Sequence, residues 1–171
     1  MPILRWLGFV PVDDGVADGH ALAEVERAFA SLGADRARFL AAFAYLLGRV
    51  ARADHDVSDD EAASMTRLVA DVGGLPADQA ALAVRLATLQ GLRFGGTDDF
   101  LVAREFGRIA QRPDKLALLE SLFAVSAADD AIGTAEDNEI RRIASEMGLS
   151  HEDFIAARLE YARHLTARRG K

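Results

Sequence analysis

The chain has 171 residues, half of them apolar, and 27 acidic against 20 basic residues give it a formal net charge of -7. That length suits one domain with a sizeable core, and the acidic balance opposes broad contact with nucleic acid, whose binding depends on phosphate neutralisation. The absence of cysteine excludes disulfides, thiolate metal sites and cysteine nucleophiles, and it fits a cytoplasmic location.

Residues 1–19 are expected to form an N-terminal strap and a polar link. The segment contains Trp6 and Phe9 but lacks the basic start, long apolar stretch and cleavage site of a signal peptide. We expect it to pack onto the helices; a surface-binding tail is the alternative. No run approaches the ~20 apolar residues of a membrane span, so no direct membrane insertion is expected. Residues 20–171 are expected to form a single domain.

Apolar residues at helical spacing recur throughout residues 20–171, without a competing strand pattern. They predict an all-α fold, a compact bundle of seven to eight helices. The helices are expected near 20–32, 35–53, 59–73, 76–89, 98–111, 113–128, 134–147 and 150–165. The sixth is apolar around most of its circumference, which indicates a central position.

Capping signals accompany several of these helices. The Ser58 to Glu61 stretch reads as a capping box. Thr134 is predicted to cap the seventh helix, with Asp137 at the capping-box position, and Ser150 to cap the eighth, with Asp153 three residues later. Five residues give the eighth helix its expected apolar face: Phe154, Ile155, Leu159, Ala162 and Leu165.

Two acidic joints, Ala53–Glu61 and Ala128–Glu136, each link one apolar helix to the next. Each holds an Asp and a Glu seven positions apart, with a β-branched aliphatic residue three after the Asp. A shift of 75 pairs the two joints, and it also aligns flanking residues: Asp54 with Asp129, Val57 with Ile132, Glu61 with Glu136, Leu68 with Ile143, and Gly73 with Gly148. We therefore predict an internal pseudo-repeat of helical hairpins around one core.

With these paired motifs, residues 36–165 resemble the tellurite-resistance protein B (TerB)-like family. The resemblance implies a compact all-helical domain that takes part in tellurite and other stress resistance, with an acidic site suspected of binding metal. It also suggests a protein partner, such as a membrane-bound component of the same system. Relatives often carry Gly after the Asp, where this chain has His55 and Asp130.

The joints supply the hard oxygen ligands that Ca²⁺ or Mg²⁺ prefers. The principal predicted metal ligands are Asp54, Glu61, Asp129 and Glu136, with Asp56, Asp60 and Asp130 as extra ligands. The competing interpretation is structural, because acidic residues at a helix start are stabilised by capping and by the helix dipole without any metal. An EF-hand is excluded, since its sixth and twelfth positions would be Asp59 and Met65 instead of Gly and Glu.

No catalytic constellation accompanies the joints. The four histidines lack zinc-ligand spacing, and no serine lies in a nucleophile elbow. We therefore expect a non-enzymatic module that binds a divalent metal and acts through a protein partner, and no organic cofactor. Two alternatives stay open: a metal-free interaction module with structural carboxylates, and a metal-dependent hydrolase that uses the same carboxylates.

Overall fold

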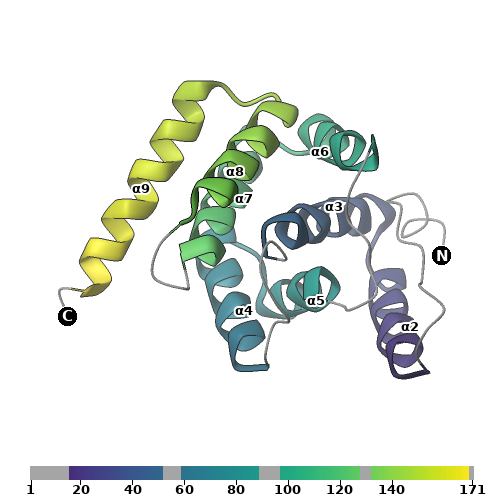
Figure 1. Ribbon diagram of the computed structural model, residues 1–171. Helices are drawn as coiled ribbons and strands as arrows, with labels where there is room; N and C mark the ends of the chain where they lie inside the picture. Colours follow the sequence, from purple (N-terminus) through teal and green to yellow (C-terminus); the bar gives the residue numbers. More distant parts are fainter. Residues whose placement is uncertain (1–15, 52–58, 89–96, 128–131, 170–171) are drawn as a thin grey trace.

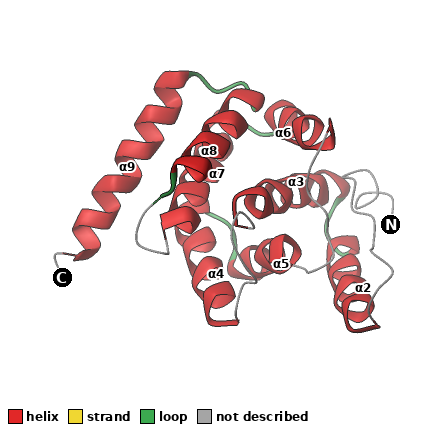
Figure 2. Cartoon of the chain, in the orientation of Figure 1, coloured by secondary structure: helices red, strands yellow, loops and turns green. Residues whose placement is uncertain are grey.

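The computed structural model describes residues 16–51, 59–88, 97–127 and 132–169 (Figure 1). These ranges contain helices joined by turns and loops, and no strand (Figure 2). The elements are α2 (Val16–Ala30), α3 (Ala34–Ala51), α4 (Asp59–Gly73), α5 (Ala77–Thr88), α6 (Thr97–Ile109), α7 (Arg112–Ser126), α8 (Thr134–Glu146) and α9 (His151–Arg169). The predicted all-α bundle is confirmed.

The two halves repeat each other on either side of the joints. Val50 of α3 and Val125 of α7 are buried at equivalent positions, as are Met65 of α4 and Ile140 of α8, and both pairs differ by 75. After α4 and α8 the chain turns through a left-handed glycine, Gly74 (φ 61°) or Gly148 (φ 78°). The structural counterpart of Gly148 is therefore Gly74 and not Gly73, because the first half has one residue more between Met65 and its glycine than the second half has between Ile140 and Gly148. α5 and α9 begin at 77 and 151, which extends the repeat to a third helix at a shift of 74.

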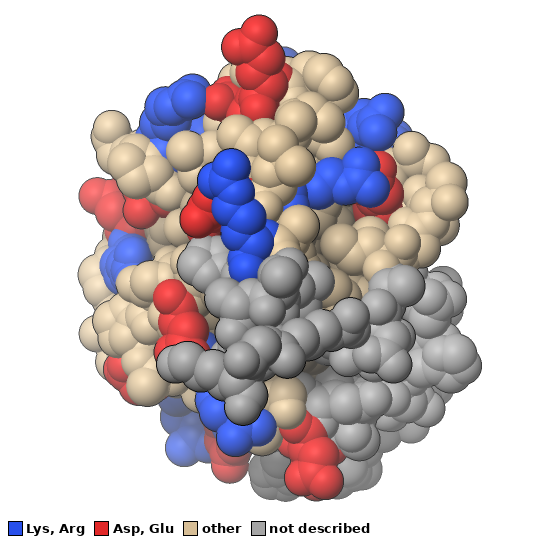
Figure 3. Space-filling model, turned by 90° about the vertical axis from the view of Figure 1, so that its left-hand side faces the viewer, with Lys and Arg blue, Asp and Glu red and all other residues tan. Residues whose placement is uncertain are grey.

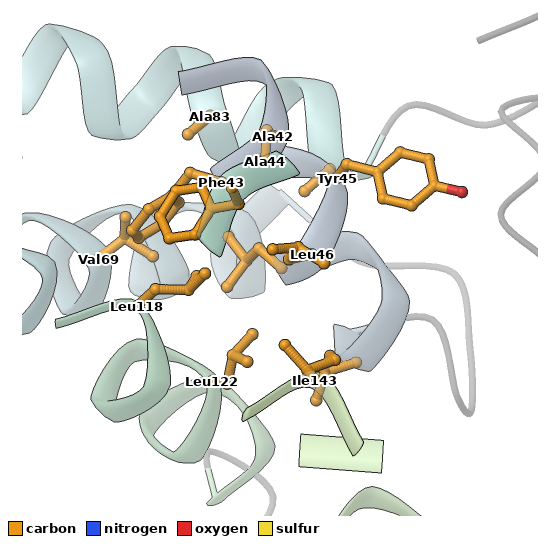
Figure 4. Packing of buried hydrophobic residues seen from close by; sticks show 14 of the residues in the cluster. Ala42, Phe43, Ala44, Tyr45, Leu46, Val69, Ala83, Leu118, Leu122 and Ile143 are labelled. Atoms are coloured by element: carbon orange, nitrogen blue, oxygen red, sulfur yellow. The ribbon is translucent and has the colours of Figure 1, made fainter. Parts of the chain in front are cut away.

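α3 forms the centre of the core and packs against α5, α6, α7 and α8. Its residues 40–47 are all buried, so the helix is covered around its whole circumference. Figure 4 shows Phe43 and Leu46 of α3 together with apolar side chains of α4, α7 and α8. α7 also lies centrally, as predicted, and packs against α3, α4, α8 and α9.

One glycine brings two helices into close contact. A Cβ built on Gly107 of α6 would lie 2.5 Å from the carbonyl oxygen of Met147, at the end of α8. The backbones of α6 and α8 can therefore approach this closely only because position 107 has no side chain.

The inward face of α9 differs from the predicted one. Phe154, Ala157 and Tyr161 are buried, whereas Ile155 and Leu159 are exposed. The Phe123 ring of α7 lies 5.5 Å from that of Phe154 and 6.5 Å from that of Tyr161, and these ring contacts set the rotation of the helix. The prediction that Ile155, Leu159 and Ala162 face inward was wrong, because both faces of α9 carry apolar residues and the sequence does not tell which one α7 covers. The side chain of Leu165 lies outside the described part of the structure.

Candidate functional site

The two acidic joints lead directly into α4 and α8. Four of the predicted ligands, Asp54, Asp56, Asp129 and Asp130, lie outside the described residues, as does His55. Two others lie in the first turn of α4: Asp60 is exposed, and the side chain of Glu61 is outside the described part of the structure. The predicted capping box at Ser58 lies outside it as well.

Glu136 is the predicted ligand whose contacts are defined. Its Oε2 accepts a hydrogen bond of 2.7 Å from the backbone N–H of Gly133, which has an extended conformation just before α8. Gly133 is thus the residue before the first turn, and Glu136 is the side chain that reaches back to it. The prediction that Thr134 and Asp137 fill these places was wrong by one residue, because α8 begins at Thr134 itself.

Asp137 instead connects α8 to α9. Its Oδ2 lies 3.3 Å from a guanidinium nitrogen of Arg141, and its Oδ1 lies 3.4 Å from Nε of Arg158. The guanidinium of Arg141 also lies over the Phe154 ring, 5.2 Å from its centroid. The carboxylates of the first turn of α8 therefore have different tasks: Glu136 caps the helix and Asp137 fixes its neighbour.

Among the residues that the structure describes, no three His, Asp or Glu side chains are grouped so that they could hold a metal ion. A carboxylate that accepts one backbone N–H can still offer its second oxygen to a cation, so the capping contact of Glu136 is compatible with either interpretation. Convergence of the joints depends on Asp54 and Asp129. The metal site therefore stays a prediction.

A buried ion-pair network lies at the end of α3, next to the first joint. Arg49 donates from Nε and an Nη to Oε1 of Glu139, at 2.9 and 2.5 Å, and from its other Nη to Oε2 of Glu146, at 2.8 Å. That second Nη also lies 3.2 Å from the carbonyl oxygen of Asp99. The Tyr45 hydroxyl donates to the Asp99 carboxylate at 2.6 Å. This Arg49 network joins α3 to α6 and α8.

Burial raises the free-energy cost of breaking the Arg49 network. Only 2% of the Arg49 side chain and 9% of the Glu146 side chain are exposed. Burial by itself would lower the pKa of Arg49, but its hydrogen bonds to Glu146 and Glu139 raise that pKa above the ordinary arginine value. Arg49 is therefore a fixed positive charge that holds the end of α3 against α8.

A capping box and an ion pair fix the start of α9. Asp153 Oδ2 accepts from the backbone N–H of Ser150 at 3.0 Å, and the Ser150 hydroxyl accepts from the Asp153 N–H at 3.1 Å. Arg112 of α7 also bonds both oxygens of Asp153, at 3.2 and 2.6 Å. The Ser150 backbone and Arg112 together lower the pKa of Asp153. The predicted Ser150 cap is confirmed.

No described helix has the length and apolar character needed to cross a membrane. The family model for the tellurite resistance protein TerB matches residues 40–159, more than half of the chain, and this range includes both joints and the Arg49 network. The chain belongs to the TerB family. TerB is not a known enzyme family. Neither the curated proteins nor the solved structures provide a match to this chain.

Proposed function

We propose that this TerB-family chain is a non-enzymatic cytoplasmic module. It binds a divalent cation at its two acidic joints and acts through a protein partner in resistance to tellurite and related stress. The observation that carries the proposal is the equivalence of the joints: the helices on either side of them bury equivalent residues, Val50 with Val125 and Met65 with Ile140, at a shift of 75. Two carboxylate loops in equivalent places have the oxygen chemistry that Ca²⁺ or Mg²⁺ requires.

The residues that would hold the cation are Asp54 and Glu61 in the first joint and Asp129 and Glu136 in the second. Asp56, Asp60 and Asp130 are the candidates for additional ligands. A bound cation would neutralise carboxylates that otherwise repel one another, and it would couple the two halves of the bundle. The protein partner would recognise the cation-bound joints. We propose that this partner is a membrane-bound component of the same system.

The metal-free module is the second candidate, and the Glu136 contact favours it. Glu136 caps α8 through the Gly133 N–H in the manner of any first-turn carboxylate, so its presence in the joint has a structural reason. A metal-dependent hydrolase would use the same carboxylates. It would need turnover that disappears in Asp54→Asn and Asp129→Asn variants which keep the fold, and a broad phosphatase and esterase screen tests for it.

A cation titration followed through backbone amide NMR signals tests the proposal. With Ca²⁺, Mg²⁺, Mn²⁺ or Zn²⁺ added singly, the amides of both joints should shift or broaden together, and the Asp54→Asn/Asp129→Asn double variant should not respond. The start of α7 is a matched internal control, because Asp114 there accepts from the Gln111 N–H at 3.1 Å without belonging to a joint. Unchanged joint signals with all four cations would reject the metal site and leave the metal-free module.

The proposed role in tellurite resistance is tested in the native host. A deletion strain should become more sensitive to tellurite, and the wild-type gene should restore growth where the Asp54→Asn/Asp129→Asn variant does not. Full restoration of growth by the double variant would show that tellurite resistance does not depend on these joint carboxylates.

A further inference from the structure

The outward face of α9 carries an apolar stripe. Ile155 and Leu159, one turn apart, are 36% and 55% exposed, and the exposed Ala162 follows on the same face. With the exposed Glu152 before them, these positions are spaced by three, four and three residues, which is the spacing of a helix–helix seam. α9 lies at the edge of the bundle in Figure 1, so this stripe is on the outside of the molecule. We call Glu152, Ile155, Leu159 and Ala162 the α9 stripe.

The repeat shows that the fold does not require the α9 stripe. α5 is the counterpart of α9 at a shift of 74, and the two helices share three buried positions: Ala80, Ala83 and Ala87 of α5 correspond to Phe154, Ala157 and Tyr161 of α9. α5 also buries Val84 and Leu86, whose counterparts in α9 are not buried. At the positions of Ile155 and Leu159, α5 has the exposed residues Ala81 and Arg85. The second half therefore exposes large apolar side chains where the first half exposes a small and a charged one. A contact outside the bundle would explain that difference.

The charges on this side of α9 indicate what makes the contact. Glu152 lies at the N-terminal end of the stripe and Arg163 beyond its C-terminal end, and both are exposed. A helix rises about 1.5 Å per residue, so Glu152 and Arg163 lie roughly 7.5 and 9 Å from the level of Ala157, in opposite directions. An antiparallel copy of α9 centred near Ala157 would thus bring Ile155 against Leu159 and Glu152 close to Arg163 at both ends.

A parallel copy would place like charges together, and an unrelated helix would need its own acidic and basic ends in matching positions. Figure 3 views the molecule from the side on which α9 lies in Figure 1. On the part of that side that the structure describes, basic and acidic side chains are interspersed, with no large area of one sign that would repel a second copy. The face is thus self-complementary in both its apolar and its charged residues, as an interface with two-fold symmetry requires.

We propose that the chain forms a symmetric homodimer in which α9 packs antiparallel against α9 of a second copy through the α9 stripe. The dimer is weak and forms with rising concentration, because a contact between single helices is at the small end of protein interfaces. The α9 stripe contains no predicted metal ligand, so the dimer can be tested whether or not the joints bind a cation.

Sedimentation equilibrium of the full chain between about 10 µM and 1 mM tests the dimer. The mean mass should rise from 18.4 kDa towards twice that value. Leu159→Lys should raise the dissociation constant by a factor of about 10 or more. Leu101→Lys is the matched control, since Leu101 is 53% exposed on α6 and should leave the constant unchanged. A monomer at every concentration, or equal effects of the two variants, would overturn the proposal.

A charge exchange tests the antiparallel arrangement. Glu152→Arg and Arg163→Glu should each weaken the dimer, because each creates two like-charge contacts, and the double variant should restore it. Failure of the double variant to recover, with far-UV circular dichroism unchanged, would reject this pairing.

Because the chain has no cysteine, introduced thiols give a direct third readout. A mixture of Glu152→Cys and Ala162→Cys chains should form disulfide-linked heterodimers under mild oxidation faster than either variant alone. Faster linkage of Ala162→Cys with itself would instead indicate a parallel pair and refute the antiparallel arrangement.

Discussion

Replacement of Arg49 by methionine should destabilise the protein strongly while it preserves most of the side-chain volume. Arg49 compensates the buried carboxylate of Glu146 and the partly exposed carboxylate of Glu139, and it donates to the Asp99 carbonyl. The variant keeps all three acceptors and removes their shared donor. A buried charge without its partner costs much more than a surface charge does, so the effect depends on how much water can reach each acceptor.

The exposed fractions allow the cost to be apportioned. Glu146, with 9% of its side chain exposed, would keep only the exposed Arg142 as a partner and should account for roughly 2–3 kcal/mol, the value for a buried charged group that loses its buried partner. Glu139, 29% exposed, can be hydrated and should add about 1 kcal/mol, and the Asp99 carbonyl less than ~1 kcal/mol. The total of about 4 kcal/mol falls within the range of ~3–5 kcal/mol measured for broken buried ion pairs.

Urea unfolding followed by far-UV circular dichroism measures this cost. With a slope of about 2 kcal/mol per molar urea, the midpoint should fall by roughly 2 M. Arg142→Met is the matched control: Arg142 bonds the same Glu146 at 3.2 Å, but 69% of its side chain is exposed, so its loss should cost less than ~0.5 kcal/mol. Equal effects of the two variants, or a cost below ~1 kcal/mol for Arg49→Met, would show that burial does not raise the free-energy cost of breaking the Arg49 network.

Two further predictions concern contacts between helices. Gly107→Ala would place a Cβ 2.5 Å from the Met147 carbonyl oxygen and should lower the free energy of unfolding by about 2–3 kcal/mol. Arg104→Ala, at an exposed position of the same helix, should change that free energy by less than ~0.5 kcal/mol, and thermal unfolding of both variants measures the difference. Asp153→Asn should destabilise the protein at neutral pH, since the Ser150 backbone and Arg112 hold the pKa of Asp153 below its ordinary value. Because a lowered pKa stabilises the fold above the ordinary value of about 3.9, the difference in unfolding free energy from wild type should shrink as the pH falls below that value; a constant difference across the titration would contradict the assignment.

Helix periodicity and capping chemistry were sufficient to predict the all-α fold, because both are local properties of the sequence. The joints were located through their repetition, and the buried pairs Val50/Val125 and Met65/Ile140 on either side of them keep the shift of 75. Local signals fail where two choices are locally equivalent. For α9, either of two apolar faces could be buried, and only contact with Phe123 of α7 decides between them.

The Arg49 network could not be predicted for a different reason. Arg49 lies off the apolar stripe of its helix, as a solvent-facing arginine would, and its partners follow 90 and 97 residues later. The i, i+7 spacing of Glu139 and Glu146 does place both carboxylates on one face of α8, which was the available signal. Nothing in the sequence connects that face to α3.

The position of Arg49 also bears on the order in which the chain can fold during synthesis. In the second half, the residue equivalent to Arg49 at the shift of 75 is Ala124, so the second half has no counterpart of this arginine. When α3, α4 and α5 have left the ribosome, the counter-charges of Arg49 and the apolar cover that α7 supplies have yet to be translated. We therefore expect the first half to remain incomplete until α8 has emerged, so that the two copies of a repeated motif mature as one cooperative unit.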